Sequence, residues 1–311
     1  MPILSTNLVP DLRLAAALDQ ALLVMLTDMA TIRNWSSAGR AAISNLGSIN
    51  SSGSTTSQIR LAGLGGRDAF VDTAAEDTDV AETALVDSHV DIQVVRSALV
   101  RQISDLGTLT GFAQDINPES LANDMGMSFE RYFNGLVGAA AATATQNVGS
   151  AAAMSVNDFY DAMAQLELDA VPGPYYLLLH NAQYSAFQAS LRSEAGAVSF
   201  IAADSDMLNL VGPGLKGEFL GVSIFTSNDV TQAAGKKEGA MFGAGAFGYM
   251  SGAPDARSFL GAGDVVQTQD GLITVEIARE PGQALTKIVG NAYCGLSVIE
   301  QDRLCGVVTG F

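Results

Sequence analysis

The chain has 311 residues, and Asp, Glu, Lys and Arg make up only 16% of them, against roughly 25% in ordinary soluble proteins. Its net charge of −17 argues against a dedicated nucleic-acid-binding protein, because such a protein needs a basic surface. No run of about 18 apolar residues indicates a membrane-spanning helix, and the N-terminus lacks the basic region of a signal peptide. We therefore expect other subunits to cover much of the surface.

The charge is unevenly distributed along the chain. Residues 1–60 contain four arginines and three aspartates, a net charge of +1, which leaves −18 for the remainder. Such a segment suits contact with phosphate while the acidic remainder faces water, although chance explains the difference equally well. The spacing of Cys294 and Cys305 fits neither a disulfide framework nor a metal-binding pair, so a reducing cytoplasmic setting is expected.

The first part of the chain predicts an arm followed by a hairpin. Apolar residues at near-helical spacing predict a helix over residues 8–33. Residues 34–57 are rich in Ser, Asn, Gly and Thr, and are expected to form an extended or mobile connector without a core. Residues 61–92 contain eight acidic side chains and one base, Arg67, and predict a long projecting hairpin that ends in a strand over residues 89–94.

The remainder predicts an α+β protein without internal repeats. Pro118, which follows a good N-cap residue, predicts a long helix over residues 118–145. A sequence typical of a capping box begins a second helix at Ser155, and Asn181 begins a third that ends near Gly196. Strands are predicted at residues 175–179, 222–225 and 272–278, and in the final stretch to Val308.

No catalytic, cofactor-binding or metal-binding residue is predicted. The glycines of residues 243–248 fit the spacing G-x-G-x-x-G, but no helix can follow them, so a flexible turn is favoured over a dinucleotide site. Residues 204–206 begin like a calcium loop but lack its later ligands and its glycine. Of the two histidines, His89 lies in a predicted strand, and His180 is interpreted as a structural residue at a strand end.

Two segments carry a resemblance to a known family. Residues 174–191 (PYYLLLHNAQYSAFQASL), followed by residues 214–227 (GLKGEFLGVSIFTS), resemble major capsid proteins of tailed bacteriophages. The last segments, residues 292–299 and 304–309, are similar to the final strand pair of that family. The order of elements agrees over essentially the whole chain, whereas the individual motifs are degenerate.

The resemblance implies the Hong Kong phage capsid fold. It assigns residues 1–60 to an N-terminal arm and residues 61–92 to an extended loop. The helix over residues 118–145 becomes the spine helix. The implied domains are a peripheral domain of residues 93–150 and 251–291, and an axial domain of residues 151–250 and 292–311.

The resemblance also implies a structural role in a virion, with copies forming the hexamers and pentamers of an icosahedral shell around double-stranded DNA. Assembly is expected in the cytoplasm of a host bacterium, with scaffolding, portal and cement or decoration proteins as further partners, and without a membrane or a cofactor. The residues expected at contacts between subunits are Leu8, Leu12, Leu22, Met25, Leu64, Phe70 and Val71. The arginines expected to face DNA are Arg13, Arg33 and Arg40.

Two departures from the family are apparent. Some members cross-link through a lysine on the extended loop, but residues 61–92 contain no lysine, so the shell is expected to depend on non-covalent contacts. Some members carry a long scaffold segment before the arm. About 60 residues precede the loop here, so we expect a separate scaffolding protein and little processing.

Two alternatives remain open at the level of sequence. An encapsulin-type nanocompartment shell has the same fold and holds enzyme cargo instead of DNA. A soluble α+β enzyme or ligand-binding protein that uses the glycines of residues 243–248 is a different class altogether.

Overall fold

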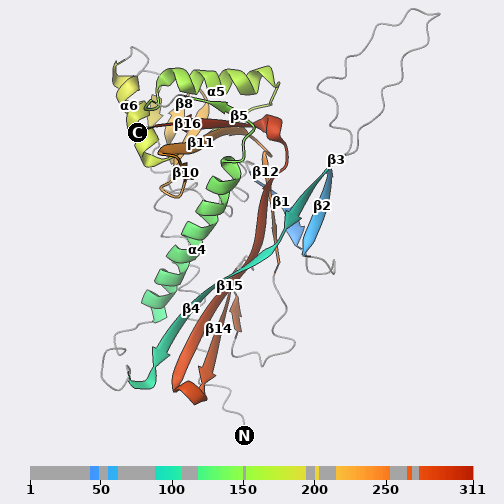
Figure 1. Ribbon diagram of the computed structural model, residues 1–311, viewed down its shortest axis with the longest axis vertical. Helices are drawn as coiled ribbons and strands as arrows, with labels where there is room; N and C mark the ends of the chain where they lie inside the picture. The colour runs from blue at the N-terminus through green and yellow to red at the C-terminus, as the bar shows by residue number, and fades with distance from the viewer. Residues whose placement is uncertain are drawn as a thin grey trace, which may run out of the picture.

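The computed structural model describes residues 43–48, 55–61, 88–106, 118–149, 152–193, 200–202, 215–252, 265–267 and 273–310. These residues form helices and strands in two large sheets and one small one (Figure 1), which confirms the predicted α+β class. Among the described helices, none is long and apolar enough to cross a membrane. All ten residues predicted at subunit contacts or against DNA lie outside the described part of the chain.

The first large sheet is built around one long strand, β15, which pairs with neighbours along both of its edges. Residue Val289 of β15 pairs with Glu276 on one side and with Val100 on the other, so the strands of these two partners flank β15. The strands of this sheet, in spatial order, are β1 (Ile43–Ser48), β12 (Phe247–Ser251), β15 (Leu285–Val298), β14 (Ile273–Glu280) and β13 (Val265–Gln267), with β4 (Val95–Ser104) on the other edge of β15. Only the pair of β1 and β12 is parallel.

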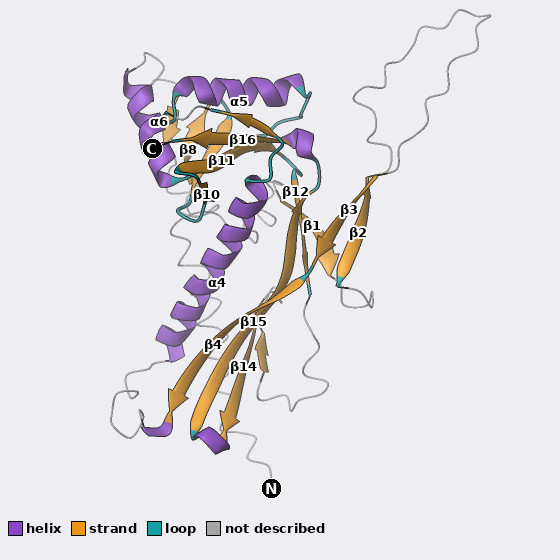
Figure 2. Ribbon diagram, in the orientation of Figure 1, coloured by secondary structure: helices purple, strands orange, loops and turns teal. Residues whose placement is uncertain are grey.

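The second large sheet carries two helices, α5 (Val156–Leu168) and α6 (Asn181–Ser193), as Figure 2 shows. Phe159 of α5 and Phe187 of α6 pack against Phe219 of the sheet, with ring centroids 4.9 and 5.7 Å away. The strands, in spatial order, are β5 (Gln146–Val148), β16 (Leu304–Thr309), β11 (Lys236–Gly243), β6 (Tyr175–Leu179), β9 (Val222–Thr226), β8 (Leu215–Phe219) and β7 (Phe200–Ala202), with β10 (Gln232–Ala233) paired to β11.

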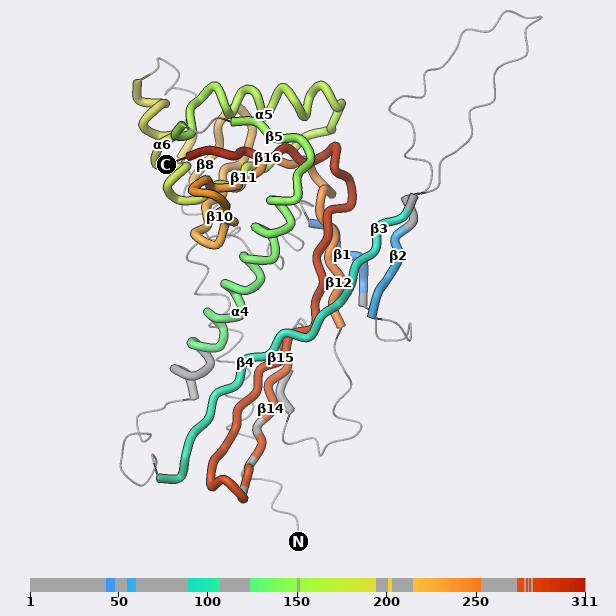
Figure 3. Tube along the Cα trace, in the orientation of Figure 1, coloured from blue at the N-terminus to red at the C-terminus, as the bar shows by residue number. Residues whose placement is uncertain are grey.

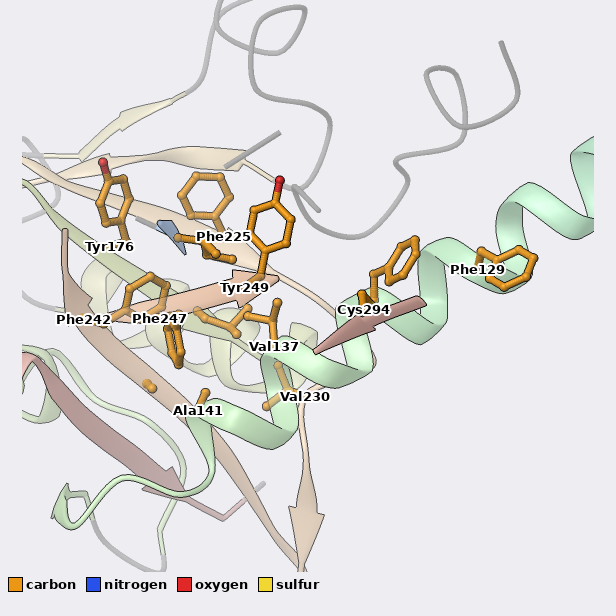
Figure 4. Packing of buried hydrophobic residues seen from close by; sticks show 14 of the residues in the cluster. Phe129, Val137, Ala141, Tyr176, Phe225, Val230, Phe242, Phe247, Tyr249 and Cys294 are labelled. Carbon is orange, nitrogen blue, oxygen red and sulfur yellow. The ribbon is translucent and has the colours of Figure 1, made fainter. Parts of the chain in front are cut away.

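Helix α4 (Pro118–Ala141) links the two large sheets. Its apolar face, which includes Phe129, Val137 and Ala141, lies in one hydrophobic core together with residues from both sheets (Figure 4). Tyr176 and Phe242 come from the second sheet, whereas Phe247, Tyr249 and Ile288 come from the first. One continuous core therefore holds the two sheets together.

The predicted helices agree closely with the structure. Helix α4 begins at Pro118 as predicted, but it ends at Ala141 and not at residue 145. The hydroxyl of Thr143 donates to the carbonyl of Ala140, which competes with the backbone bond that would continue the helix. At α5 the predicted capping box is confirmed, because the Ser155 hydroxyl accepts from the Asp158 amide while the Asp158 carboxylate accepts from the Ser155 amide. Helix α6 begins at Asn181, as predicted.

One expectation was wrong in part. Residues 34–57 were expected to contribute nothing to a core, yet β1 lies within this segment and Ile43 is buried in the shared core. Pairing with β12 satisfies the backbone of β1 regardless of its polar composition, so two apolar side chains, Ile43 and the half-buried Leu46 that packs over Gly248, suffice to anchor the strand. The helix predicted over residues 8–33 lies outside the described residues.

The sheets also divide the chain at other points than the implied domains. Strand β12 and the second half of β15 belong to the first sheet, whereas boundaries at residues 250 and 292 assign nearly all of these residues to the axial domain. The chain passes between the sheets at Ala244–Ala246 and again at Ile299–Arg303. The functional names of the domains remain predictions.

A two-stranded ribbon, β2 (Thr56–Leu61) and β3 (Ser88–Gln93), leads away from the first sheet (Figure 3). Its base is anchored tightly: Ile92 is buried, and a Cβ atom on Gly295 of β15 would lie 2.1 Å from the carbonyl oxygen of Gln93. Only glycine permits this approach between β3 and β15. The ribbon joins the two ends of residues 62–87, which lie outside the described residues, so the extended loop itself remains a prediction.

We predict opposite effects of two alanine substitutions on α4. Nothing lies within 4 Å of a Cβ atom on Gly135, so Gly135→Ala should stabilise the protein by roughly 0.5–1 kcal/mol, through the better helix propensity of alanine. A Cβ atom on Gly138 meets the carbonyl oxygen of Asp229 at 2.8 Å, so Gly138→Ala should destabilise it by about 1–3 kcal/mol. Thermal unfolding of the two variants measures both effects. Equal Tm changes of the same sign would contradict the described packing of α4.

We predict that Gly295→Ala loosens the base of the ribbon, because the added methyl group displaces the backbone of Gln93. The amide of Val94, which donates to Thr55 at 2.8 Å, should then exchange its hydrogen at least ten-fold faster. Gly282→Ala is the matched control, since no atom lies within 4 Å of the added methyl group. Exchange at Val94 that is unchanged in Gly295→Ala would show that β3 does not approach β15 as described.

Candidate assembly surfaces

Of the glycines in residues 243–248, Gly245 lies in a turn, as predicted, whereas Gly243 ends β11 and Gly248 lies in β12. The turn connects β11 of the second sheet to β12 of the first, and Gly245 adopts a positive φ of 74° within it. Arg303 fastens the turn by donating from Nη1 to the carbonyl of Ala244 at 2.8 Å, and it also pairs with Glu300. A strand follows the glycines instead of a helix, so the arrangement has no helix N-terminus to receive a dinucleotide phosphate.

The surroundings of His180 and of the two cysteines indicate structural roles. His180 accepts a hydrogen bond at Nδ1 from the Ala182 amide at 3.0 Å, and burial, followed by the charge of Lys237, lowers its pKa below the ordinary histidine value. Both cysteines are free and buried, and burial raises the pKa of Cys294 to about 12 and of Cys305 to about 11. Among the described residues, no group of three or more His, Cys, Asp or Glu residues could hold a metal ion.

Strand β4 presents a long backbone edge. Over ten residues it pairs with β15 on one side, and no described strand pairs with its other side. Val95 and Val100 are exposed on this strand, while Arg96 donates to Asn291 at 2.9 Å and Arg101 pairs with Asp124 at 2.6 Å. The edge contains no proline or lysine, which proteins commonly use to protect such edges from pairing with another chain.

The ribbon formed by β2 and β3 is a second candidate surface. Beyond its anchored base it consists of two strands, and an isolated two-stranded sheet is only marginally stable in water. His89 and Asp91 are exposed on β3, and Gln58 is exposed on β2. A partner that packs on this ribbon therefore supplies stability that the ribbon lacks alone.

The predicted contact residues are not tested by this geometry. The arm residues Leu8, Leu12, Leu22 and Met25, the loop residues Leu64, Phe70 and Val71, and the arginines Arg13, Arg33 and Arg40 all lie outside the described residues. Sequence reasoning missed the edge strand β4, although Val95 and Val100 are β-branched residues of the kind that favours strands. The missing information was the pairing partner of each edge, which a single strand's sequence does not contain.

No protein-family model and no curated protein matches the chain. Solved structures do match it. In the capsid of Ralstonia phage GP4, the matching chain has 12% sequence identity and a TM-score of 0.61, with 92% of each chain covered. The holo-SrpI encapsulin complex from Synechococcus elongatus PCC 7942 gives 14% identity and a TM-score of 0.58, with 88% of each chain covered.

A virus-like particle from Pyrococcus furiosus also matches, with 10% identity, a TM-score of 0.53, and coverage of 95% of this chain and 97% of that chain. These identities are low, so the similarity concerns the fold, and it extends over nearly the full length of both chains in each case. The chain has the Hong Kong phage capsid fold, which is the fold of the phage capsid proteins it resembles.

Proposed function

We propose that the chain is the major capsid subunit of a tailed bacteriophage, a structural protein without catalytic activity that tiles with copies of itself into an icosahedral shell around double-stranded DNA. The observation that carries the proposal is the match to the Ralstonia phage capsid over 92% of each chain. A match of this extent leaves little of the chain for an additional catalytic domain. The hexamers and pentamers expected from the sequence belong to the same proposal.

The unpaired edge of β4 and the projecting ribbon support the role of a shell subunit that packs side by side with its copies. Strand β4 offers ten residues of unpaired backbone edge within the described part of the chain, and the ribbon projects from the body. In a shell, a strand of a neighbouring copy adds to such an edge, and backbone hydrogen bonds with some burial of Val95 and Val100 stabilise the contact. Charged residues at only 16% are also in keeping with a surface that neighbours cover.

The contacts of the arm and loop are part of the proposal. Leu8, Leu12, Leu22 and Met25 of the arm, with Leu64, Phe70 and Val71 of the loop, are proposed to bury apolar area on neighbouring copies. Arg13, Arg33 and Arg40 are proposed to face the packaged DNA, through contacts that do not depend on base sequence. The absence of lysine from residues 61–92 favours assembly by non-covalent contacts. Assembly in the host cytoplasm, with separate scaffolding, portal and cement proteins, is part of the same proposal.

An encapsulin-type shell is the second candidate, and the match to the SrpI encapsulin favours it specifically. Both candidates have the same fold and the same need for self-assembly. They differ in the content of the shell, which is DNA in one case and a cargo enzyme in the other.

We predict that the purified chain forms particles of megadalton mass, because its edges are completed only by other copies. Size-exclusion chromatography followed by electron microscopy measures this directly. A stable species at 32 kDa, or a dimer of that subunit, at high concentration would contradict the proposal and favour a soluble binding protein or enzyme. The absorbance ratio at 260 and 280 nm of particles from infected or expressing cells separates a DNA-filled shell from one that holds protein.

We predict that a chain without residues 1–33 gives soluble capsomers that do not close, since closure depends on the arm reaching a neighbour. Negative-stain micrographs and the elution volume show whether closed shells remain. A deletion of the same length elsewhere would remove helices or strands of the core, so the full-length chain, purified in parallel, is the reference. Normal shells from the shortened chain would refute the proposed role of the arm.

A further inference from the structure

Helix α6 begins with a capping box in which a histidine takes the place of the usual serine or threonine. His180 precedes the helix, and its Nδ1 accepts a hydrogen bond from the Ala182 amide at 3.0 Å. In return, Oε1 of Gln183 accepts from the His180 amide at 3.0 Å. This reciprocal pair satisfies two of the amides that a helix start leaves without a helical partner. The capping box of α5 has the same arrangement but is built on the Ser155 hydroxyl.

The imidazole makes the cap of α6 sensitive to acid. A ring nitrogen that accepts a hydrogen bond carries no proton, so His180 caps the helix only while its ring is neutral. Protonation turns Nδ1 into a donor that faces another donor, the Ala182 amide, and the bond is lost. The charged ring would also lie at the N-terminus of a 13-residue helix, where the helix dipole disfavours positive charge.

The charged side chains near His180 do not compensate for a positive ring. Lys237 of β11 acts on it with a charge of the same sign. The next residue of that strand, Glu238, points to the opposite face of the sheet, because side chains alternate along a strand. Asp229, in the turn after β9, pairs with Arg131 of α4 at 3.6 Å.

The other elements packed around α6 bring no acidic side chain to His180. Helix α6 contains no acidic residue, and its basic residue, Arg192, lies in its last turn. Strands β6 and β16 contain no Asp, Glu, Lys or Arg. Helix α5 meets α6 near the far end, where the Val156 amide donates to the Ser190 hydroxyl at 3.2 Å.

The direction of the pH effect follows from these surroundings. Burial, and then the charge of Lys237, lower the pKa of His180 below its ordinary value of about 6.5. The folded protein therefore favours the neutral ring. The cap contributes its full stability above a pH of about 6.5, and this contribution is lost as the pH falls from there toward the lowered pKa.

The capping glutamine connects the start of α6 to the last strand of the chain. Gln183 is fully buried, and its Nε2 donates to the carbonyls of Lys237 and Val307, both at 3.1 Å, and to the Thr309 hydroxyl at 2.9 Å. These acceptors belong to β11 and β16, so one side chain joins the helix start to two strands. Figure 1 shows the C-terminus of the chain beside α6.

We propose that His180 is an acid-sensitive helix cap, whose protonation opens the first turn of α6 and loosens the hold of Gln183 on the last residues of the chain. The change concerns the fold of the subunit itself, so it is independent of what a shell contains.

The test is hydrogen exchange, followed by mass spectrometry, on the full-length chain at about pH 7.5 and about pH 5. Labelling times are scaled for the pH dependence of chemical exchange. Peptides that cover residues 180–187 should exchange roughly ten-fold faster at the lower pH, and those that cover residues 304–310 should follow with a smaller increase. The start of α5, residues 156–159, is the internal reference and should keep its protection.

Two neutral caps remove the acid response. Asparagine and serine cap helices well and carry no charge at either pH, so His180→Asn and His180→Ser should keep the protection of α6 at about pH 5. His89→Asn is the matched control, because His89 is the other histidine of the chain and is exposed on β3. This control should respond to acid as the parent chain does.

Three outcomes would contradict the proposal. Equal acid responses of the parent chain and of the neutral-cap variants would overturn it. An equal loss of protection at the starts of α5 and α6 would also overturn it, because that result indicates general unfolding in acid. Acid opening of α6 without faster exchange in residues 304–310 would overturn the connection through Gln183. Where a variant lowers the Tm at about pH 7.5, the comparison of α6 with α5 in the parent chain decides.

Discussion

Helix α4 touches both large sheets at places where a glycine makes room for it. Near its start, Met125 and Phe129 occupy the space above Gly290 of β15. Near its end, its own Gly138 lies against the backbone of Asp229, beside the second sheet. These contacts position the helix over the core that both sheets share, in which Phe242 of the second sheet also packs directly on Phe247 of the first. The two connecting segments at Ala244–Ala246 and Ile299–Arg303 then only have to bridge sheets that are already held in place.

The molecule therefore combines a well-packed interior with an unpaired strand edge and exposed apolar side chains at its periphery. The shared core holds the two sheets together, and the aromatic cluster of Phe159, Phe187 and Phe219 holds α5 and α6 on the second sheet. The β4 edge, the ribbon and the outer face of α5 lie at its periphery, where little of the chain's own apolar surface covers them. In a shell subunit, copies associate through such edges and surfaces, and the free energy of association stabilises the subunit only when copies meet.

The sequence predicted the helices well because their signals are local. The capping box at Ser155 and the proline at the start of α4 act within a few residues, and both are found as expected. The anchoring of β1 was not predictable, because its partner β12 lies about 200 residues further along the chain and no local signal links them. Edges such as β4 were missed for the same reason. The candidate contact residues of the arm and loop came from resemblance and lie outside the described residues, so the geometry neither supports nor opposes them.

The order of pairing in the first sheet also constrains the timing of folding. Strand β1, at residues 43–48, needs β12 at residues 247–251, and both depend on β15, which ends at Val298. Such distant pairings fold slowly, and a chain emerging from the ribosome cannot form them until nearly its whole length has been made. Strand β1 is therefore synthesised early and is among the last of the described strands to be secured. Because β4 also pairs with β15, the long edge of the first sheet exists only once synthesis is nearly complete.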